Sequence, residues 1–511
     1  MTMELQKIPH LSEIPALNGA FAGAGEKHTE TFHERMYEKN KVVSSIEEAV
    51  RLTGLKSGMT VSFHHHFRNG DYIVNIVMDV LANMGFKNLT LAASSLTDIH
   101  APLIEHIKNG VIGHIETSGL RGRLAEEISR GLMDFPIVFR SHGGRAAAIE
   151  SGALHIDVAF LGAPSCDPYG NANGYNRDEE NVSCCGSLGY AKLDALYADQ
   201  CVIITDHLVP FPNAPFGIPE SNVDYIVKVD SVGDPKGIMS GATRFTKNPK
   251  ELLIAKTAAD VIEASGYFYD GFSMQMGSGG ASLATARFLR DKMLKQNIKA
   301  RFALGGITGQ IVEMHEEGLV QKILDVQSFD LIAANSLKNN RFHQQIDASY
   351  YASYLNRGAA VAQLDFVVLS ALEVDVDFNV NVLTGSDGVI RGAIGGHPDT
   401  AAGASLSVVV APLTRGRIPS IVRRVNTIVT PGETVDVLVT DQGVAVNPKR
   451  PEILEKLKAA GLPLFTIEQL RERGERIVGI PDPIEYDEKI VGVVMFRDNT
   501  VIDLIKKVKN V

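Results

Sequence analysis

A carboxylate stands at the end of an apolar run in the segment "FVVLSALEVDVDFNVN", which begins at Phe366. The run is typical of a buried parallel strand, and Glu373 comes directly after it. In open α/β sheets, ligands bind beyond the carboxyl ends of strands, where a glutamate can act as a nucleophile or a base. An isolated acid at a strand end is also an ordinary surface feature, so Glu373 needs further support before a catalytic role is assigned.

Three glycine-rich loops could supply backbone N–H donors close to strand ends. "QMGSGGAS" precedes a helical pattern, as an anion cradle at a helix N-terminus does. "RGAIGGHPDT" follows Glu373, and "LGGIT" ends another strand pattern. The glycine pair Gly395 and Gly396 is the candidate oxyanion site beside Glu373. Such donors suit an oxyanion or a pantetheine-like chain, for which the candidate residues are Gly277, Gly279, Gly280, Gly305, Gly306, His397 and Asp399.

Histidines and arginines in other loops could bind an anionic substrate. In "FHHHFRNGD", His64 and His66 share one face of a strand, while His65 points away. Two histidines without a third ligand do not indicate zinc, so no metal site is expected. The candidate anion-binding residues are His64, His65, His66, Arg145 and Arg391; purely structural roles or solvated loops remain the alternative.

Composition excludes several classes of function. The chain has 511 residues and a net charge of −10, which disfavours nucleic acid or an anionic membrane as a partner. Its four cysteines form no CxxC pair, and Cys184 and Cys185 are expected to be buried small residues. No apolar run is long enough to span a membrane, and the N-terminus lacks the apolar stretch of a signal peptide. A cytoplasmic globular protein is expected.

The chain repeats itself over a long period. "DVAFLGAPSCDPYGNAN" at Asp157 matches "DFVVLSALEVDVDFNVN" at Asp365, and three further segment pairs match in the same order. Strand patterns alternate with helical patterns, which predicts parallel sheets covered by helices. We therefore predict an α/β fold with two homologous doubly wound domains at 45–243 and 244–511, preceded by an N-terminal arm at 1–44.

The duplication separates Glu373 from its polar neighbours. Asp167 matches Asp375 within a D-x3-N-x-N frame common to both halves, so this frame is expected to shape a turn. Glu373 lies outside the frame, and its counterpart is Ser165. A carboxylate in one copy and a hydroxyl in the other is what specialisation of one half would produce, which favours the catalytic interpretation.

These segments resemble the acyl-CoA transferase superfamily. "DVAFLGAPSCDPYGN" looks like its strand–turn signature, and "LEVDVDFNVN" with "GAIGGHPD" and "VLVTDQGVA" is similar to its hydrolase and hydroxybutyrate transferase members. A closer resemblance is to the citrate lyase alpha subunit family. It is carried by "SGMTVSFHHHFRNGD", "NLTLAASSL", "SGLRGRLAEEISRGL", "CCGSLGYAK" and "NVNVLTGSDGVIRGAIGGHPDTA", and covers nearly the whole chain from about residue 40.

The resemblance implies a two-domain CoA-transferase-type fold and a citrate:acetyl-acyl-carrier-protein transferase, in which citrate displaces acetate from an acetyl thioester. It implies no tightly bound cofactor, because the thioester is carried on a phosphoribosyl-dephospho-CoA arm of an acyl carrier (gamma) subunit, with acetyl-CoA as a surrogate. A Mg²⁺-dependent beta subunit would cleave the citryl thioester, and a homo-oligomer within the complex is expected.

Two departures from the superfamily pattern leave the mechanism open. "FHHHF" replaces a glycine-rich loop, and "GGHPDT" lacks the usual ending in Asp-Phe. Related transferases use the glutamate as a covalent nucleophile, so a glutamyl intermediate and direct transfer both remain possible for Glu373. The alternative functions are a free-standing acyl-CoA transferase or thioester hydrolase, and a ligand-sensing α/β protein without enzymatic activity.

Overall fold

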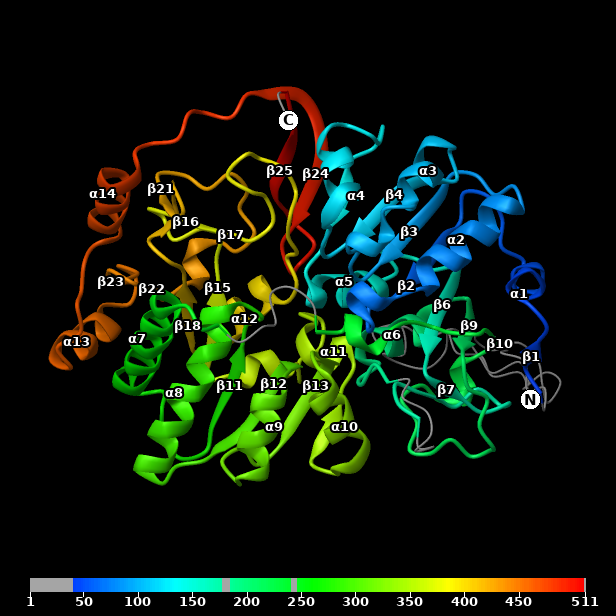
Figure 1. Cartoon of the computed structure of the whole chain (residues 1–511), viewed down its shortest axis with the longest axis horizontal. Helices are drawn as coiled ribbons and strands as arrows, with labels where there is room; N and C mark the ends of the chain where they lie inside the picture. Colours follow the sequence, from blue (N-terminus) through cyan, green and yellow to red (C-terminus); the bar gives the residue numbers. More distant parts are fainter. Residues whose placement is uncertain (1–39, 177–183, 240–245, 510–511) are drawn as a thin grey trace, which may run out of the picture. The chain divides into compact units, whose positions relative to one another are not determined.

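Two sheets of mainly parallel strands organise the chain (Figure 1). The computed structural model describes residues 40–176, 184–239 and 246–509. In sheet order, the ten-stranded sheet contains β1 (Val42–Val43), β10 (Tyr225–Lys228), β9 (Gln200–Thr205), β6 (Val158–Ala163), β2 (Thr60–Phe63), β3 (Leu89–Ala93), β4 (Ile112–Thr117), β5 (Ile137–Phe139), β24 (Tyr486–Met495) and β25 (Val501–Val508). The eight-stranded sheet contains β14 (His343–Gln345), β13 (Ile323–Ser328), β12 (Ala300–Ile307), β11 (Phe272–Met276), β15 (Phe366–Ser370), β18 (Leu406–Val410), β22 (Val437–Thr440) and β23 (Gly443–Val446).

The two sheets have the same internal strand order. β5-β4-β3-β2-β6-β9-β10 in the first corresponds to β14-β13-β12-β11-β15-β18-β22 in the second. The registers agree as well, since Val61 lies opposite Val158 and Met274 lies opposite Phe366. This shared topology confirms the predicted α/β fold and is what a duplication requires. The domain boundaries 45–243 and 244–511 stay a prediction.

Helices connect most of the parallel strands, as right-handed crossovers require. They are α1 (Ile46–Leu52), α2 (Ile73–Asn83), α3 (Leu103–Lys108), α4 (Gly122–Ser129), α5 (His142–Glu150), α6 (Gly189–Tyr197), α7 (Pro249–Ser265), α8 (Gly280–Gln296), α9 (Gly309–Glu316), α10 (Leu331–Asn339), α11 (Ala348–Ala352), α12 (His397–Gly403), α13 (Pro451–Ala459) and α14 (Ile467–Val478). Local sequence explains several ends: Asn248 caps α7 through its side chain, Pro249 begins the helix, and Gly266 ends it in the left-handed conformation. No described helix is long and apolar enough to cross a membrane.

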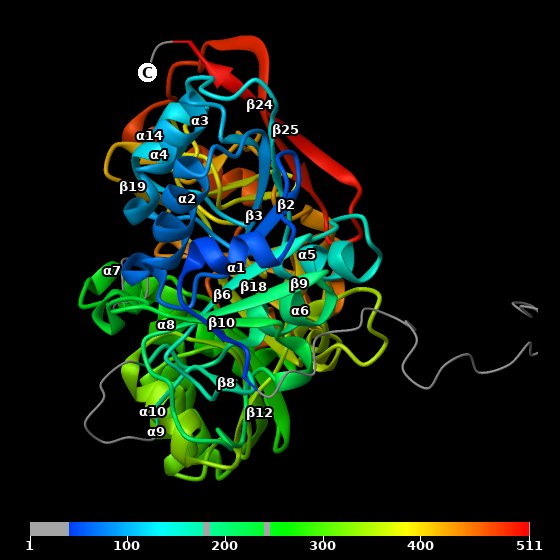
Figure 2. The same ribbon diagram turned by 90° about the vertical axis from the view of Figure 1, so that its right-hand side faces the viewer.

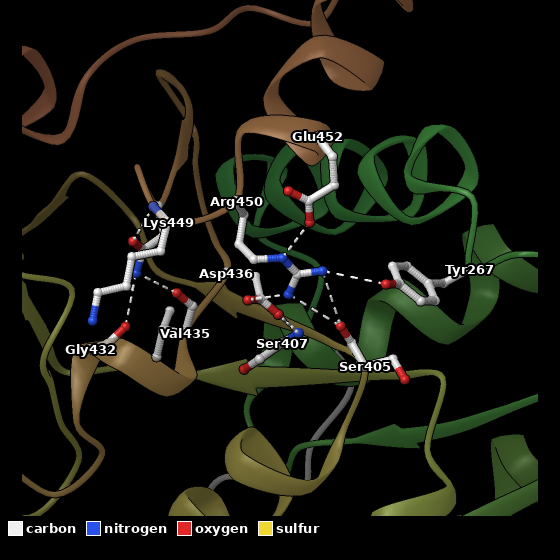
Figure 3. Close-up of polar contacts among 10 residues, drawn as sticks. Tyr267, Ser405, Ser407, Gly432, Val435, Asp436, Lys449, Arg450 and Glu452 are labelled. Carbon is white, nitrogen blue, oxygen red and sulfur yellow. Dashed lines mark hydrogen bonds and ion pairs between the residues drawn. The ribbon is translucent and has the colours of Figure 1, made fainter.

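An aspartate directly before β10 and another directly before β22 make the same kind of contact, each accepting a hydrogen bond from the backbone of a neighbouring strand region. Asp224 accepts a hydrogen bond from the Cys201 backbone N–H, and Asp436 accepts one from that of Ser407. Asp436 also pairs with Arg450, whose guanidinium bonds to Glu452 and faces Ser405 and Tyr267 (Figure 3). This network fastens the start of α13 to β18 and β22.

The polar frame after β6 and β15 forms matching turns. Ser165–Cys166 (β7) pairs with Ala172–Asn173 (β8), and Glu373–Asp375 (β16) pairs with Val380–Asn381 (β17). Asp167 Oδ1 accepts from three backbone N–H groups of its turn, and Asp375 Oδ1 accepts from two. The frame therefore shapes turns, as the sequence predicted. Ile421–Val422 (β21) pairs in parallel with β16, and Thr414–Arg415 (β19) pairs antiparallel with Ile418–Pro419 (β20).

The C-terminal hairpin crosses back to the first sheet. β24 pairs in parallel with β5, and β25 pairs antiparallel with β24 (Figure 2). This pairing of a C-terminal strand with the sheet of the first half was not predicted from the sequence. At the other end, residues 1–39 of the predicted arm lie outside the described residues, while Val42–Val43 forms the edge strand β1.

Candidate active site

A cavity of about 400 Å³ lies where loops from both sheets meet. Its walls include residues that follow β2, β3, β4 and β5 in the first half and β11, β13, β15 and β18 in the second, together with Gly306 within β12. The lining consists of residues 275–281, 369–372 and 393–397, with His65, Arg68, Ser95, Thr97, Ser118, Arg121, His142, Tyr190, Glu251, Gly306, Gln327, Phe329, Tyr351, Val382, Val410, Pro412 and Arg415. This is the expected ligand position for open α/β sheets.

The loop before α12 is bound to the first half by its backbone. Gly392 O accepts from the Leu120 N–H at 2.9 Å, and the Ile394 N–H donates to Ser118 O at 2.7 Å. Gly395 O accepts from the His142 N–H at 2.9 Å. These bonds bring the predicted glycine pair Gly395-Gly396 into the cavity wall beside the N-terminus of α5.

In the loops 277–280 and 395–396, glycine is required by close packing or by the backbone conformation, and several of these glycines also have backbone N–H groups without an acceptor. A Cβ at Gly279 would overlap the Ser370 hydroxyl, and a Cβ at Gly396 would overlap that of Tyr351. Gly395 has a φ of 56°, which favours glycine. Within the described part of the chain, the backbone N–H groups of Gly279, Gly280, Gly395 and Gly396 have no acceptor, so they are available to a ligand.

Other residues predicted for arm binding have different surroundings. The Gly277 N–H donates to Val368 O and is already occupied. Gly306 lines the cavity, whereas Gly305 does not and packs instead against Gln275. His397 lines it too, but its ring nitrogens contact Thr430 Oγ1 at 2.7 Å and Ser370 O at 3.2 Å. Burial lowers the pKa of His397 to about 4, so the ring is neutral near pH 7.

Asp399 is fully buried outside the cavity lining. It bonds to the Ser141 hydroxyl at 2.8 Å and to the Gly143 N–H at 2.9 Å, and so holds α12 against the start of α5. Asp399 therefore makes a contact between the two halves, and its role in binding the arm stays a prediction.

Only one member of the histidine triplet reaches the cavity. His65 lines it and bonds through Nδ1 to Ser94 Oγ. His64 contacts Gly162 O at 3.0 Å, and its ring packs against His66 at 3.9 Å between centroids, as expected for residues on one face. Burial lowers the pKa values of all three histidines. His64 and His66 do not line the cavity, and their role in anion binding stays a prediction.

Neither predicted arginine faces the cavity. Arg145 forms a buried bidentate pair with Asp194, at 2.6 and 2.8 Å, so its charge is already neutralised. Arg391 lies on an exposed surface, where it bonds to Asp387 and Glu126. Both arginines thus form ion pairs within the protein, and their role in citrate binding stays a prediction.

The cavity instead contains side chains that sequence reasoning missed. Arg68 and Arg121 enter it from the loops after β2 and β4, and His142 enters from the start of α5. Burial, followed by the Arg145 charge, lowers the pKa of His142 to about 3, so its imidazole is neutral. Their position in the sequence could have indicated this role, because "FRNGD" with Arg68 and "GLRGR" with Arg121 both directly follow strand patterns.

Glu373 is buried but is not among the residues that line the cavity. Its Oε2 accepts from Asn381 Nδ2 at 2.9 Å and from the Asn426 N–H at 3.2 Å, and its Oε1 accepts from Asn426 Nδ2 at 3.2 Å. Burial is the main cause that raises the pKa of this carboxyl, with Asp375 adding to it. The preceding Leu372 does line the cavity, so a catalytic role for Glu373 stays a prediction.

Among the described residues, one surface group has atoms spaced to bind a metal ion. His155, Asp157 and Asp199 have ligand atoms within 4.8 Å of one another, and none of the three lines the cavity. Asp157 also accepts from the Thr60 N–H, as Asp365 does from Ser273 in the second half. The position of Asp157 in this group is thus explained by its hydrogen bond to the backbone of the neighbouring strand, without a metal ion.

Duplicated sheets with a cavity at their strand ends define an α/β protein of the CoA-transferase type. Solved structures with low identity share this fold: the malonate decarboxylase alpha subunit of Acinetobacter baumannii has a TM-score of 0.63 at 17% identity, covering 87% of this chain and 92% of its own. The family model for the citrate lyase alpha subunit matches residues 39–508. The chain belongs to that family.

Full-length relatives agree with this membership. The citrate lyase alpha chain of Escherichia coli is 59% identical over all of both chains, and that of Haemophilus influenzae is 59% identical over 93% of this chain and 94% of its own. A Streptococcus mutans citrate lyase alpha subunit, solved with citrate, has a TM-score of 0.90 at 56% identity, covering 94% of this chain and 96% of its own. The family resemblance and the transferase assignment made from sequence are thereby confirmed.

Proposed function

We propose that this chain exchanges citrate for acetate on an acetyl thioester inside the cavity. The observation that carries the proposal is a single cavity that combines free backbone N–H groups from two glycine loops with two guanidinium groups, Arg68 and Arg121. Carboxylate exchange needs both elements, because its substrates are anions and its intermediates are oxyanions. Family membership supports the same activity.

The bond changes can be followed atom by atom. A carboxylate oxygen adds to the thioester carbonyl carbon, and the C–S bond breaks to release a thiolate. The thiolate then attacks the citryl carbonyl carbon of the resulting mixed anhydride, which forms a new C–S bond and breaks the C–O bond to acetate. Acetate leaves with an oxygen that entered as carboxylate, so no water is consumed and no net proton transfer is needed.

Each addition places negative charge on a carbonyl oxygen. We assign its stabilisation to the N–H groups of Gly395 and Gly396, with Gly279 and Gly280 on the opposite loop. One donor of this kind contributes about 3–4 kcal/mol to such a transition state. His142 is neutral, so it adds a polar ring to the cavity without a further positive charge.

The thioester arm and the partner subunits form the finer part of the proposal. We propose that the acyl group arrives on a phosphoribosyl-dephospho-CoA arm of an acyl carrier subunit, and that acetyl-CoA can replace it. Apolar lining at Leu369, Ala371, Leu372 and Pro412 suits the uncharged end of such an arm. A separate lyase subunit would then cleave the citryl thioester, and the chain would form homo-oligomers within the complex. The four cysteines are buried and none forms a disulfide, which supports a cytoplasmic location.

A purified chain tests this proposal directly. With citrate and acetyl-CoA, mass spectrometry should detect citryl-CoA and one equivalent of acetate. With citrate and Mg²⁺ alone, a malate dehydrogenase assay should detect no oxaloacetate. Release of acetate without citryl-CoA, independent of citrate, would identify a hydrolase, and sustained oxaloacetate formation would refute the division of labour.

A further inference from the structure

Arg68 is a buried cation at the cavity wall. Its side chain is 9% exposed, and its guanidinium lies 4.9 Å from the centre of the Phe329 ring. Across residues 40–176, 184–239 and 246–509, no carboxylate pairs with it, and Nη1 has no hydrogen-bond partner. Burial lowers the pKa of Arg68 to about 10, which leaves the group charged at neutral pH.

Arg121 places a second cation on the same wall. It precedes α4 and lines the cavity, and no described residue forms an ion pair with it. Burial lowers its pKa, and Asp98 opposes that change without a direct contact. The Arg121 charge is also the second cause of the lowered pKa of Arg68, so the two cations repel each other.

The other buried arginines of the first half are neutralised. Arg145 is paired with Asp194, and Arg140 is paired with Glu116 at 2.7 Å. Glu251 is a carboxylate of the cavity lining, but its charge acts on Arg415. An unpaired cation removed from water is unfavourable unless a ligand compensates it, and here the buried Arg68 and the half-buried Arg121 occur together.

We propose that Arg68 and Arg121 bind the carboxylates of the incoming acid that do not react, and so make the site selective for polycarboxylates over monocarboxylates. The inference rests on the proposed exchange reaction and adds the residues that choose its acid. Guanidinium groups suit this task because their N–H groups pair with carboxylate oxygens in a fixed fork. Acetate, which has only the reacting carboxylate, makes no such contact.

Two exchange reactions separate selectivity from catalysis. The first is citrate-dependent formation of citryl-CoA from acetyl-CoA, and the second is exchange of isotopically labelled acetate into acetyl-CoA. For Arg68→Gln and Arg121→Gln, kcat/KM for citrate should fall about 10- to 100-fold relative to kcat/KM for acetate exchange, mainly through KM. Arg68→Lys should give a smaller fall, because it keeps the charge but loses the fork.

Arg123→Gln is the matched control, because it removes one positive charge from an exposed site two residues from Arg121. It should leave the ratio of the two reactions unchanged. Equal losses in both reactions for the Arg68 and Arg121 variants, or no loss in either, would overturn the inference. If one variant does not fold, the other carries the test. Absence of acetate exchange in the wild-type chain would instead count against the proposed function.

Discussion

Asp399 gives the clearest quantitative prediction, because it is a fully buried carboxyl that joins the two halves. It accepts bonds from Ser141 and Gly143, which flank the cavity residue His142, and Arg497 Nε lies 4.0 Å from its Oδ1. Burial raises the pKa of Asp399 from 3.8 to about 6, although the bond from Gly143 and the Arg497 charge oppose this. The folded state therefore binds the Asp399 proton more tightly than the unfolded state does.

The sign of the pH effect follows from this difference in proton binding. Between pH 3.8 and 6 the folded chain retains a proton that the unfolded chain has released, so the free energy of unfolding falls as pH rises. A rise of about two units corresponds to roughly 3 kcal/mol, complete above pH 6. Asp399→Asn cannot ionise, and it loses this pH dependence together with one hydrogen bond, a fixed cost of about 1–3 kcal/mol.

The prediction can be tested by measuring the free energy of unfolding in urea for the wild type and Asp399→Asn from pH 4 to pH 7.5. The stability of the variant relative to the wild type should improve by roughly 3 kcal/mol across that range. Asp387→Asn is the control: Asp387 is partly exposed and its pKa is lowered, so its difference from wild type should be small and opposite in slope. A difference between Asp399→Asn and wild type that stays constant with pH would refute the reasoning.

Three further substitutions address the site and its support. Gly396→Ala would force a Cβ against the Tyr351 hydroxyl, so we expect about 1–3 kcal/mol of destabilisation and about 100-fold slower exchange, measured by unfolding and by citryl-CoA formation. Glu373→Gln should lower exchange by several orders of magnitude with folding intact if the sequence prediction is right; near-normal citryl-CoA formation would leave Glu373 as a structural carboxylate. Arg450→Ala leaves Asp436 buried without its cation, so stability should fall by about 1–3 kcal/mol while exchange is retained.

The repeated architecture was readable from sequence because each half encodes it locally. Apolar runs, helical patterns and turn residues recur in the same order, and the Asp167 and Asp375 turns follow from side-chain bonds to nearby backbone. The C-terminal hairpin had no such signal. β24 pairs with β5 (Ile137–Phe139) more than 300 residues away, and nothing within the hairpin specifies that partner.

Side-chain direction was the main limit on predicting the site. Leu372 lines the cavity while Glu373 bonds to Asn381 and Asn426, and His65 lines it while His64 does not. Neighbours in an extended chain point to opposite sides, so an error of one residue moves a side chain out of the site. The ion-pair partners of charged side chains could not be predicted either, since nothing in the sequence indicated that Asp194 would neutralise Arg145.

The duplication explains why one cavity has two chemically different walls. In the alignment that places Gly58 on Gly271, the loop 64–68 after β2 matches the loop 277–281 after β11, and both loops reach the cavity. The first supplies the His65 and Arg68 side chains, whereas the second supplies the backbone N–H groups of Gly279 and Gly280. A backbone donor suits a transient oxyanion, and a guanidinium suits a permanent carboxylate. Divergence of two equivalent loops would thus divide acyl transfer and acid recognition between the two halves.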